Sequence, residues 1–400
     1  MEMDKASLLA SISCLTSEAQ AFKKNGSSDK ATRYEVRTAA LALADALEFP
    51  VEQALRIVFE STPPLIALRI AFEGGFLNHF GGGETQTADS LSAITGADRT
   101  LIARIFRILT ASKTVDEIGV DSYAANDLTR AFLMPGIGDA NTHGCDNVNP
   151  IFAKLPEYLS QMDWVNPDTY SMGPHVFTFG RPLWKRLESE PHKSALFNKI
   201  MSAFKQNREN WVDIFPFEER LQNSVPADQV LVINIAGGVG HRLRDFKLKF
   251  PWASGRAVLQ DQKHVLPTTE SNSKAFADLQ ECDIETMAHD IFKPQPVQGA
   301  RYYFFSAIFH GRPNSACLEL LRNTAPALKK DYSRILINDF VIPEKGANLF
   351  QASFDLWMMA DSTGQERTLR EWNELFDACG LKLVEVHTLG VDSVLEVELA

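Results

Sequence analysis

The 400-residue chain lacks the features of several large protein classes. No stretch approaches the roughly 20 apolar residues of a transmembrane helix, and the N-terminus shows no basic region followed by an apolar run. Lysine and arginine number only 40 against 51 aspartate and glutamate residues, so the formal net charge is −11. An acidic chain is a poor partner for the phosphates of nucleic acids. We therefore expect a cytoplasmic protein that binds neither a membrane nor a nucleic acid.

Cysteine is also scarce. The five cysteines are scattered, and no two of them have C-x-x-C spacing. An odd number of widely spaced thiols argues against a disulfide framework and against structural zinc. Because no other cluster has metal-ligand spacing, we expect no metal cofactor. Apolar residues make up 45% of the chain, enough for a folded core, and the length corresponds to two or three domains of roughly 150 residues.

Residues 1–130 are expected to form a mostly helical N-terminal domain. Alanine, leucine and glutamate dominate residues 1–60, and the first proline is Pro50. Residues 38–47 are apolar almost all round the expected helix. That pattern indicates burial against another surface, such as a second subunit.

A finer pattern follows within the same domain. A short helix is predicted over 87–94, a longer one over 101–109 that begins at Asp98-Arg99-Thr100, and a hairpin over 114–123. One face of the longer helix is expected to carry Leu101, Ile105, Ile108 and Leu109. Helix, helix, hairpin is the order of a winged-helix module. In an acidic chain we expect such a module to serve dimerisation rather than DNA binding.

Residues 131–225 are predicted to be a helical connector, punctuated by prolines and rich in aromatic residues. Aromatic side chains in such a region usually form a core, and they can also line a pocket for a flat substrate. From residue 226 onward strands alternate with helices. The strands are expected at Val230–Ile235, Ala257–Leu259, Tyr302–Phe305, Arg334–Asn338 and Leu381–Val386. This alternation predicts a parallel sheet covered on both faces.

The first of these strands runs into a glycine turn that is typical of nucleoside-cofactor binding. Gly237, Gly238 and Gly240 allow the backbone to turn tightly and to approach a ligand. Asp261 follows about 20 positions later at the end of the next strand, where it can accept hydrogen bonds from ribose hydroxyls. NAD and S-adenosylmethionine (SAM) both satisfy this pattern.

Further motifs decide between the two cofactors. They are Gly237-Gly238-Val239-Gly240-His241, Val258-Leu259-Gln260-Asp261, Met287-Ala288-His289-Asp290, Pro294-Gln295-Pro296-Val297-Gln298-Gly299-Ala300 and Glu366-Arg367-Thr368. With these motifs residues 65–400 resemble the fungal class I SAM-dependent O-methyltransferases, which are related to the plant caffeate enzymes. The resemblance implies a winged-helix dimerisation domain over 1–130, the connector over 131–225 and a Rossmann-like SAM-methyltransferase domain over 226–400. It also implies a homodimer.

The family's functional residues can be carried onto this chain. The resemblance implies that the glycine loop and Asp261 hold the methionine and ribose parts of SAM, and that Asp290 holds the adenine side. His310 matches the family's general base, and Asp339 and Glu366 match the two acidic residues beside it. A histidine titrates near neutral pH, and a carboxylate partner fixes its tautomer, so the pattern suits removal of a hydroxyl proton.

Four departures from the family pattern surround these residues. The family's His-Asp-Trp is His310-Gly311-Arg312 here, and its Lys or Arg four residues before the base is Ser306. The Asp-Val-Gly that opens the glycine motif is Asn234-Ile235-Ala236, and the usual Glu at the acidic partner is Asp339. Each lost contact costs about 1–2 kcal/mol, so the pattern predicts weakened SAM binding.

The departures favour a second activity within the same fold. A subset of the family, typified by the leporin-forming pericyclase, catalyses dehydration and pericyclic ring closure of quinone methides. The chain resembles that subset at Asp339, at Pro343-Glu344-Lys345-Gly346-Ala347 and at His143. His143, His310 and Arg312 would then donate hydrogen bonds to a carbonyl oxygen.

Three functions follow from these patterns. The first is a pericyclase of secondary metabolism that acts on a small polyketide or alkaloid-type substrate, with SAM bound weakly or not consumed. The second is an O-methyltransferase for a phenol or enol, with His310 as its base. The third is a non-catalytic scaffold.

Overall fold

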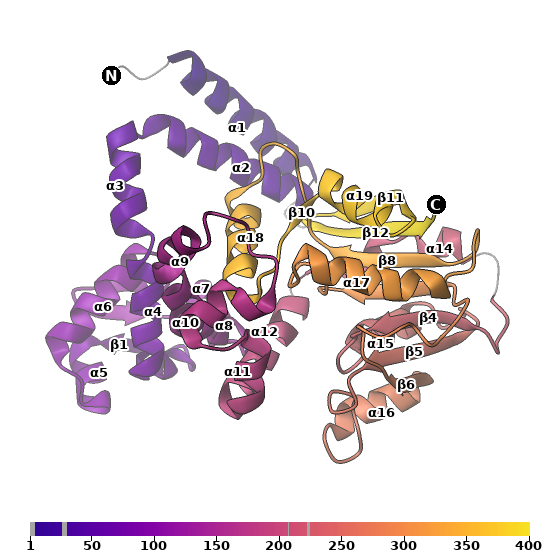
Figure 1. The fold of residues 1–400 in the computed structure, drawn as a ribbon. Coiled ribbons are helices and arrows are strands. Elements are labelled where there is room, and N and C mark those ends of the chain that lie inside the picture. The colour runs from indigo at the N-terminus through magenta and orange to yellow at the C-terminus, as the bar shows by residue number, and fades with distance from the viewer. Residues whose placement is uncertain (1–4, 26–29, 207, 222–224) are drawn as a thin grey trace. The chain divides into compact units, whose positions relative to one another are not determined.

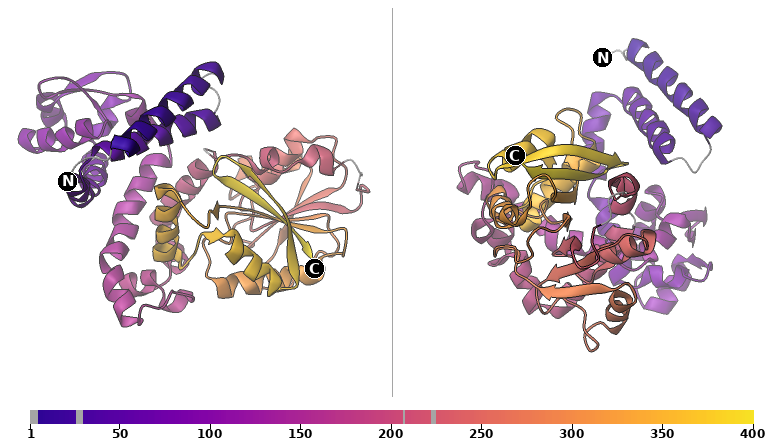
Figure 2. Two further views of the ribbon diagram at one scale, coloured as in Figure 1. Left: turned by 90° about the horizontal axis from the view of Figure 1, so that it is seen from above. Right: turned by 90° about the vertical axis from the view of Figure 1, so that its right-hand side faces the viewer.

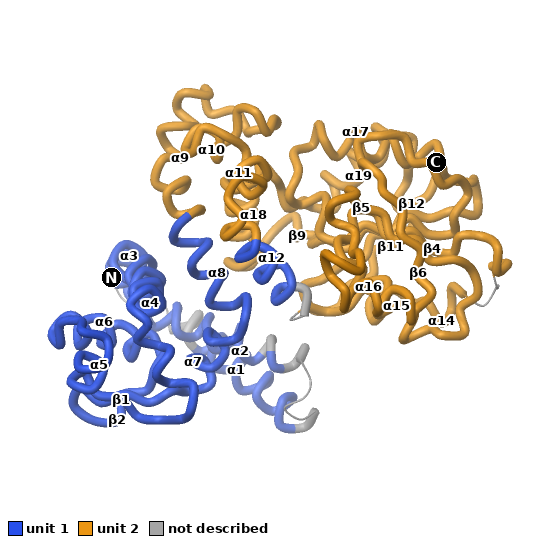
Figure 3. The backbone as a smooth tube through the Cα atoms, turned by 90° about the horizontal axis from the view of Figure 1, so that it is seen from below, with its two compact units in different colours: residues 1–146, 195–204 blue, residues 147–194, 205–400 orange. Residues whose placement is uncertain are grey.

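A computed structural model describes residues 5–25, 30–206, 208–221 and 225–400. The chain divides into two compact units, which Figure 3 colours separately. The first unit comprises residues 1–146 and 195–204, and the second comprises 147–194 and 205–400. Residues 131–225, expected as a connector, are thus shared between the units. Within the described residues, no helix is both long and apolar enough to cross a membrane.

Helices dominate the first unit, as predicted. They are α1 (Lys5–Asn25), α2 (Lys30–Leu47), α3 (Pro50–Glu60), α4 (Pro63–Glu73), α5 (Ala88–Thr95), α6 (Arg99–Ala111), α7 (Asp127–Leu133) and α8 (Ile137–His143), with the short 3-10 helix η1 (Phe76–Phe80). Helices α1 and α2 pack against each other (Figure 1). The apolar segment 38–47 is not buried within this unit, because Leu41 and Leu47 are about half exposed and only Ala39 is buried.

The predicted helix–helix–hairpin order is present in α5, α6, β2 (Asp116–Gly119) and β3 (Ser122–Ala124). The hairpin is antiparallel, and β1 (Thr85–Thr87) joins it in the strand order β1-β3-β2. Asp98 caps α6, since its carboxylate accepts a hydrogen bond from the Leu101 backbone amide at 2.9 Å.

The predicted buried face of α6 is partly wrong. Leu101 is 46% exposed, whereas Ile102 and Phe106 are completely buried. The Phe106 ring stacks on Tyr123 of the hairpin, with 4.4 Å between the ring centroids. Ile105 and Leu109 are buried as expected, so the core-facing side of α6 includes Ile102 and Phe106 beside them and leaves Leu101 outside.

A seven-stranded sheet forms the centre of the second unit. Its strands are β4 (Val230–Ile235), β5 (Arg256–Asp261), β6 (Ile284–Ala288), β7 (Tyr302–Ser306), β8 (Arg334–Asp339), β11 (Leu381–Leu389) and β12 (Asp392–Leu399). They lie in the order β11-β12-β8-β7-β4-β5-β6, and Figure 2 shows them rotated successively like the blades of a fan. The Rossmann-like fold is confirmed. The expectation of an all-parallel sheet is wrong at one strand, because β12 runs antiparallel to both of its neighbours.

Helices cover both faces of this sheet, as expected. On one face α17 (Asn314–Thr324) and α19 (Leu369–Asp377) pack on Ile233, Phe305 and Ile337. On the other face α13 (Trp211–Ile214), α14 (Phe217–Arg220), α15 (His241–Lys249) and α16 (Ser273–Glu281) pack on Val232 and Phe304. Side chains alternate between the faces along each strand, so one strand contributes to both cores.

The remaining helices and strands of the second unit lie outside the sheet. They are α9 (Asn149–Gln161), η3 (Tyr170–Met172), α10 (Pro174–Phe179), α11 (Leu183–Ser189) and α18 (Leu349–Ser362), with a small parallel pair of strands, β9 (Val341–Ile342) and β10 (Arg367–Thr368). Helix α12 (Pro191–Gln206) is divided between the units. Helix α18 contacts α9 and α10, and strand β9 follows the end of β8.

Candidate active site

The glycine turn after β4 has the backbone geometry of a ligand-binding loop. Gly238 and Gly240 have positive φ angles of 65° and 89°. A Cβ on Gly237 would lie 2.3 Å from Asn234 Oδ1, whereas a Cβ on Gly238 would meet nothing within 4 Å. The turn is therefore packed tightly beneath Gly237 and open above Gly238, where a ligand can approach the backbone.

Ala236 stands in the same turn with a φ of 53°. The left-handed region costs a residue with a Cβ about 1–2 kcal/mol. The family that the sequence resembles has glycine at this position, so Ala236 introduces backbone strain into the loop.

Asp261 meets the glycine turn directly. It ends β5, and its Oδ2 accepts a hydrogen bond from the Gly238 amide at 2.8 Å. Its Oδ1 accepts a bond from the Gln262 amide at 2.7 Å. The two halves of the nucleoside pattern, which are about 20 residues apart in sequence, therefore lie in contact.

Asp290 follows β6, the strand next to β5 at the edge of the sheet. Its Oδ1 accepts a hydrogen bond from the Phe292 amide at 3.0 Å, which closes a local turn. Phe292 lines a groove of about 330 Å³, together with Tyr170, Pro313 and Ser315. An open groove with aromatic walls therefore adjoins the segment that the sequence assigned to the adenine side.

Ser306, at the end of β7, is engaged within the protein. Its hydroxyl donates a hydrogen bond to Asn338 Oδ1 at 3.2 Å. Asn234, at the base of the glycine turn, is 1% exposed and donates to the Phe304 carbonyl at 3.4 Å. Asn234 and Ser306 are therefore neutral at the two positions where the family resemblance gives an aspartate and a lysine or arginine.

These residues fit SAM. The Gly238 backbone faces open space, and the carboxylate of Asp261 lies within hydrogen-bonding distance of the same turn. Carboxylate oxygens accept hydrogen bonds from ribose hydroxyls, and a backbone without a side chain lets a bulky nucleoside come close.

His310 lies in the turn after β7 and pairs with a buried carboxylate. Its Nδ1 is 2.9 Å from Glu366 Oε1, and the exposed fractions of the two side chains are 13% and 1%. Because a carboxylate only accepts, Nδ1 carries a proton and the Nε2 of the neutral ring is left as a base. Burial lowers the pKa of His310, but Glu366 and Asp339 outweigh burial and leave that pKa above its ordinary value.

Asp339 completes the cluster from the end of β8. The residue is 1% exposed, and its Oδ2 accepts a hydrogen bond from the Phe309 amide at 3.1 Å. Burial raises the pKa of Asp339, and the nearby charge of His310 opposes that rise. The structure thus brings together His310, Asp339 and Glu366, which the sequence assigned to one site.

A cluster of phenylalanine rings adjoins the imidazole through Phe354. The Phe354 ring stacks on His310 with 5.8 Å between centroids, and Phe350 stacks on Phe354 at 5.8 Å. Phe340 meets Phe354 edge-on at 5.6 Å. Such surroundings suit a flat aromatic substrate.

The Arg312 side chain folds back against the loop that carries it. Its Nη1 donates to the Ile308 carbonyl, and its buried Nε has no hydrogen-bond partner among the described residues. His143 ends α8 in the first unit, where its ring meets Phe197 edge-on at 5.6 Å. His143 and His310 therefore belong to different units, and the catalytic roles of His143 and Arg312 stay predictions.

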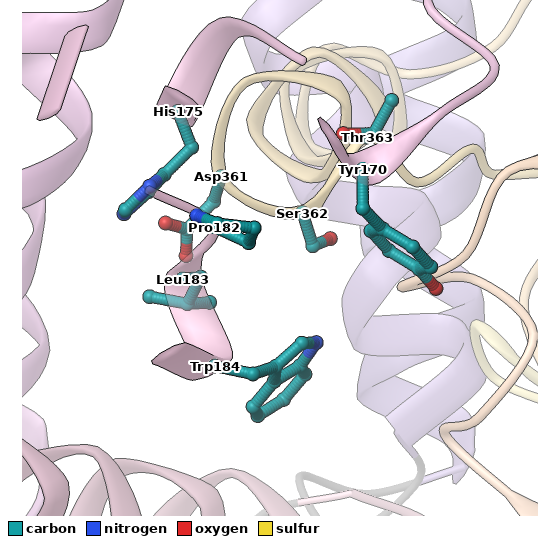
Figure 4. A pocket seen from close by; sticks show the side chains of 8 residues that line it. All are labelled: Tyr170, His175, Pro182, Leu183, Trp184, Asp361, Ser362 and Thr363. Atoms are coloured by element: carbon teal, nitrogen blue, oxygen red, sulfur yellow. The ribbon is translucent and has the colours of Figure 1, made fainter. Parts of the chain in front are cut away.

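A small cavity in the second unit was not predicted from the sequence. Its volume is about 10 Å³, and it is lined mainly by Tyr170, His175, Trp184 and Asp361 (Figure 4). Asn147 Nδ2 donates to Asp361 Oδ1 at 2.6 Å, and Arg186 Nη1 donates to Asn147 Oδ1 at 2.7 Å. The members of this buried chain of hydrogen bonds are far apart in sequence, so no local spacing indicates it.

Three side chains at the far end of the sheet are close enough to share a cation: Glu385, His387 and Glu396. Arg220 already lies 3.1 Å from Glu385 and 3.3 Å from Glu396, and Arg334 lies 3.3 Å from Glu396. The two guanidinium groups satisfy these carboxylates, so the cluster is an ion-pair network and not a good metal site.

Comparison with known proteins identifies the family. The O-methyltransferase domain family matches residues 162–382. Over 99% of each chain, the sequence is 32% identical to methyltransferase cfoC of Aspergillus candidus. The chain belongs to the O-methyltransferase family. It is also 30% identical to O-methyltransferase lepI of Aspergillus flavus, over 89% of this chain and 91% of that one.

Solved structures of O-methyltransferase-family proteins agree with the fold. The structure of LepI with SAM superposes with a TM-score of 0.85 at 28% identity, covering 99% of this chain and 100% of the other. The structure of OxaC with sinefungin and meleagrin gives a TM-score of 0.83 at 27% identity, with the same coverage. Another neighbour, described as a pericyclic reaction enzyme, also gives 0.83, at 26% identity and the same coverage. The proteins that this chain resembles thus include both named methyltransferases and a structure named for a pericyclic reaction.

Proposed function

We propose that this O-methyltransferase-family protein transfers a methyl group from SAM to a phenol or enol of a small secondary metabolite. The observation that carries the proposal is the buried pair of His310 Nδ1 and Glu366 Oε1, 2.9 Å apart. A pericyclic reaction needs hydrogen-bond donors around an apolar substrate. An oriented imidazole that presents a basic Nε2 is instead what removal of a hydroxyl proton requires.

The cofactor residues have separate tasks in this proposal. The Gly238 backbone and the Asp261 carboxylate would hold the methionine and ribose parts of SAM, and Asp290 the adenine side. Ser306 would contribute a neutral contact where relatives of the family have a cation. When bound, SAM supplies an electrophilic methyl group on a sulfonium.

His310 acts on the substrate hydroxyl. Its Nε2 accepts the proton while Glu366 stabilises the imidazolium from the other side of the ring, and Asp339 adds a second negative charge. The substrate oxygen gains the negative charge that nucleophilic attack requires. The rings of Phe340, Phe350 and Phe354 exclude water and orient a flat substrate beside the imidazole.

The test is an assay of S-adenosylhomocysteine release with a panel of phenols and enols. The proposal predicts that at least one acceptor is methylated and that His310→Gln abolishes the reaction while cofactor binding persists. His192→Gln, the same substitution at an exposed histidine of α12 outside the proposed site, serves as the matched control. Methylation at the wild-type rate by the His310→Gln variant would contradict the proposal.

A pericyclase is the second candidate. It is supported by the similarity to the structure described as a pericyclic reaction enzyme and by the residues that depart from the family pattern, Asn234, Ala236, Ser306 and Arg312. In this reading the substrate is a polyketide or alkaloid-type alcohol that dehydrates to a quinone methide. Turnover of such a substrate without release of S-adenosylhomocysteine would distinguish this activity from methyl transfer.

We also infer that the first unit is a winged-helix-type dimerisation module. The support is the exposed apolar surface of α2 and α3, where Leu41, Leu47, Leu55, Val58 and Phe59 are each 48–68% exposed. Exposed apolar side chains in such number favour association. Sedimentation of the full chain tests this inference, which predicts a dimer and is contradicted by a monomer at micromolar concentration.

A further inference from the structure

Arg367 is a buried cation whose hydrogen bonds all end on neutral oxygens. The residue is 0% exposed. Its Nη1 donates to the Phe309 and Gln365 carbonyls at 3.0 Å each, its Nη2 to the Arg312 carbonyl at 2.9 Å, and its Nε to Asn314 Oδ1 at 2.9 Å. Among the described residues, no carboxylate lies within ion-pair distance of this guanidinium. Arginine is seldom fully buried without a counter-ion, so its task here is not charge pairing.

Two of the four oxygens that Arg367 binds, the Phe309 and Arg312 carbonyls, belong to the turn that carries His310. Both backbone polar groups of Phe309 are bonded, because its amide donates to Asp339 and its carbonyl accepts from Arg367. The His310 carbonyl accepts a hydrogen bond from the Gln365 amide at 2.8 Å. With the bond between His310 and Glu366, three consecutive residues, 365 to 367, each hold this turn.

The side chain that makes these contacts is itself firmly anchored. The Arg367 backbone pairs with Val341 in the small parallel sheet of β10 and β9. Its guanidinium lies 5.4 Å from the ring centroid of Trp372, which is also buried. A planar fork of five donors can reach four separate acceptors at once, whereas the single ammonium of lysine cannot.

We propose that Arg367 is a positioning residue, which holds the Phe309–Arg312 turn in the geometry that keeps the His310 imidazole on Glu366. The importance of Arg367 for catalysis rests on the proposed role of His310 as proton acceptor. Its effect on the position of His310 can be measured without a substrate, so the positioning role and the proposed function can be tested separately.

The test is an NMR titration of protein labelled with carbon-13 at the histidine ring, with the His310 signal assigned by its loss in His310→Gln. The charged groups that face His310 are Glu366, Asp339 and Arg208, and Arg367→Lys alters none of them. Loosening the turn lengthens the contact to Glu366, so the pKa of His310 should fall by about one in Arg367→Lys. Arg370→Lys is the control, because Arg370 is 63% exposed and bonds Glu344 and Glu374 away from the turn.

A second variant covers a failure of Arg367→Lys to fold. Asn314→Ala removes one acceptor of the guanidinium and should lower the pKa of His310 in the same direction by a smaller amount. An unchanged His310 titration in folded Arg367→Lys, or in Asn314→Ala, overturns the positioning role. A lowered pKa in a chain that transfers no methyl group would contradict the proposed function and leave the positioning role standing.

Discussion

Gly364 is the residue at which a single added methyl group tests the geometry of the catalytic turn. A Cβ at this position would lie 2.1 Å from the His310 carbonyl oxygen and 2.9 Å from two backbone atoms of Gly311. These atoms belong to the main chain and cannot rotate away. Gly364→Ala must therefore push the chain at residue 364 away from the turn at His310 and Gly311. Overpacking of this kind costs typically 1–3 kcal/mol.

The displacement also breaks specific contacts. The hydrogen bond from the Gln365 amide to the His310 carbonyl is lost, and the imidazole moves away from Glu366. At roughly 2–4 °C per kcal/mol for a domain of this size, Gly364→Ala should lower the melting temperature by several degrees. We expect methyl transfer to be lost as well.

Gly311→Ala is the matched control in the same turn. A Cβ there would meet no atom closer than Ser362 Oγ at 3.7 Å, which is ordinary van der Waals contact. Differential scanning fluorimetry of both variants and of the wild type is the assay. If Gly364→Ala melts together with Gly311→Ala and the wild type, the close approach of these two segments is refuted.

Three further predictions concern the pair of His310 and Glu366 and the glycine turn with Asp261. Glu366→Gln replaces a charge-assisted hydrogen bond by a neutral one and should lower the pKa of His310 by about one, as measured by NMR. Because the pKa of His310 is raised in the folded state, its stabilising contribution is complete below about pH 6.5 and is lost as the pH rises through the folded-state pKa. Urea unfolding at several pH values should show this loss in the wild type and little of it in Glu366→Gln. Asp261→Ala should weaken SAM binding by about 10–100-fold in calorimetry, because a hydrogen bond to a charged group is worth roughly 1.5–3 kcal/mol; equal affinities would contradict the assignment. Ala236→Gly removes a left-handed alanine and should stabilise the chain by up to about 1 kcal/mol, since part of the gain is offset in the unfolded state; a lower urea midpoint would contradict the strain.

The strands of the seven-stranded sheet show which kinds of strand can be predicted from sequence alone. The range 230–235 was predicted and is found, because a run of β-branched residues that ends in glycines indicates a buried parallel strand. Strand β12 was missed. It buries Asp392, Ser393 and Glu396, so its sequence does not read as apolar. Arg208 pairs with Asp392 and Arg334 with Glu396, and these long-range partners make the burial possible.

The site divides in the same way. The contact of Asp261 with Gly238 follows from one strand–helix–strand unit of β4, α15 and β5, so local spacing was sufficient to predict it. The convergence of His310, Asp339 and Glu366 came from the family resemblance, because no spacing rule links three separate strand ends. The chain from Arg186 through Asn147 to Asp361 joins residues up to 214 positions apart, and no motif in the sequence indicated it.

The most direct test of the account is calorimetric titration of the full chain with SAM and with S-adenosylhomocysteine, alongside Asp261→Ala. We expect micromolar binding of both ligands to the wild type and a marked loss in the variant, because the glycine turn and Asp261 form a built site. No binding at millimolar ligand would contradict it, since methyl transfer from SAM would then be excluded.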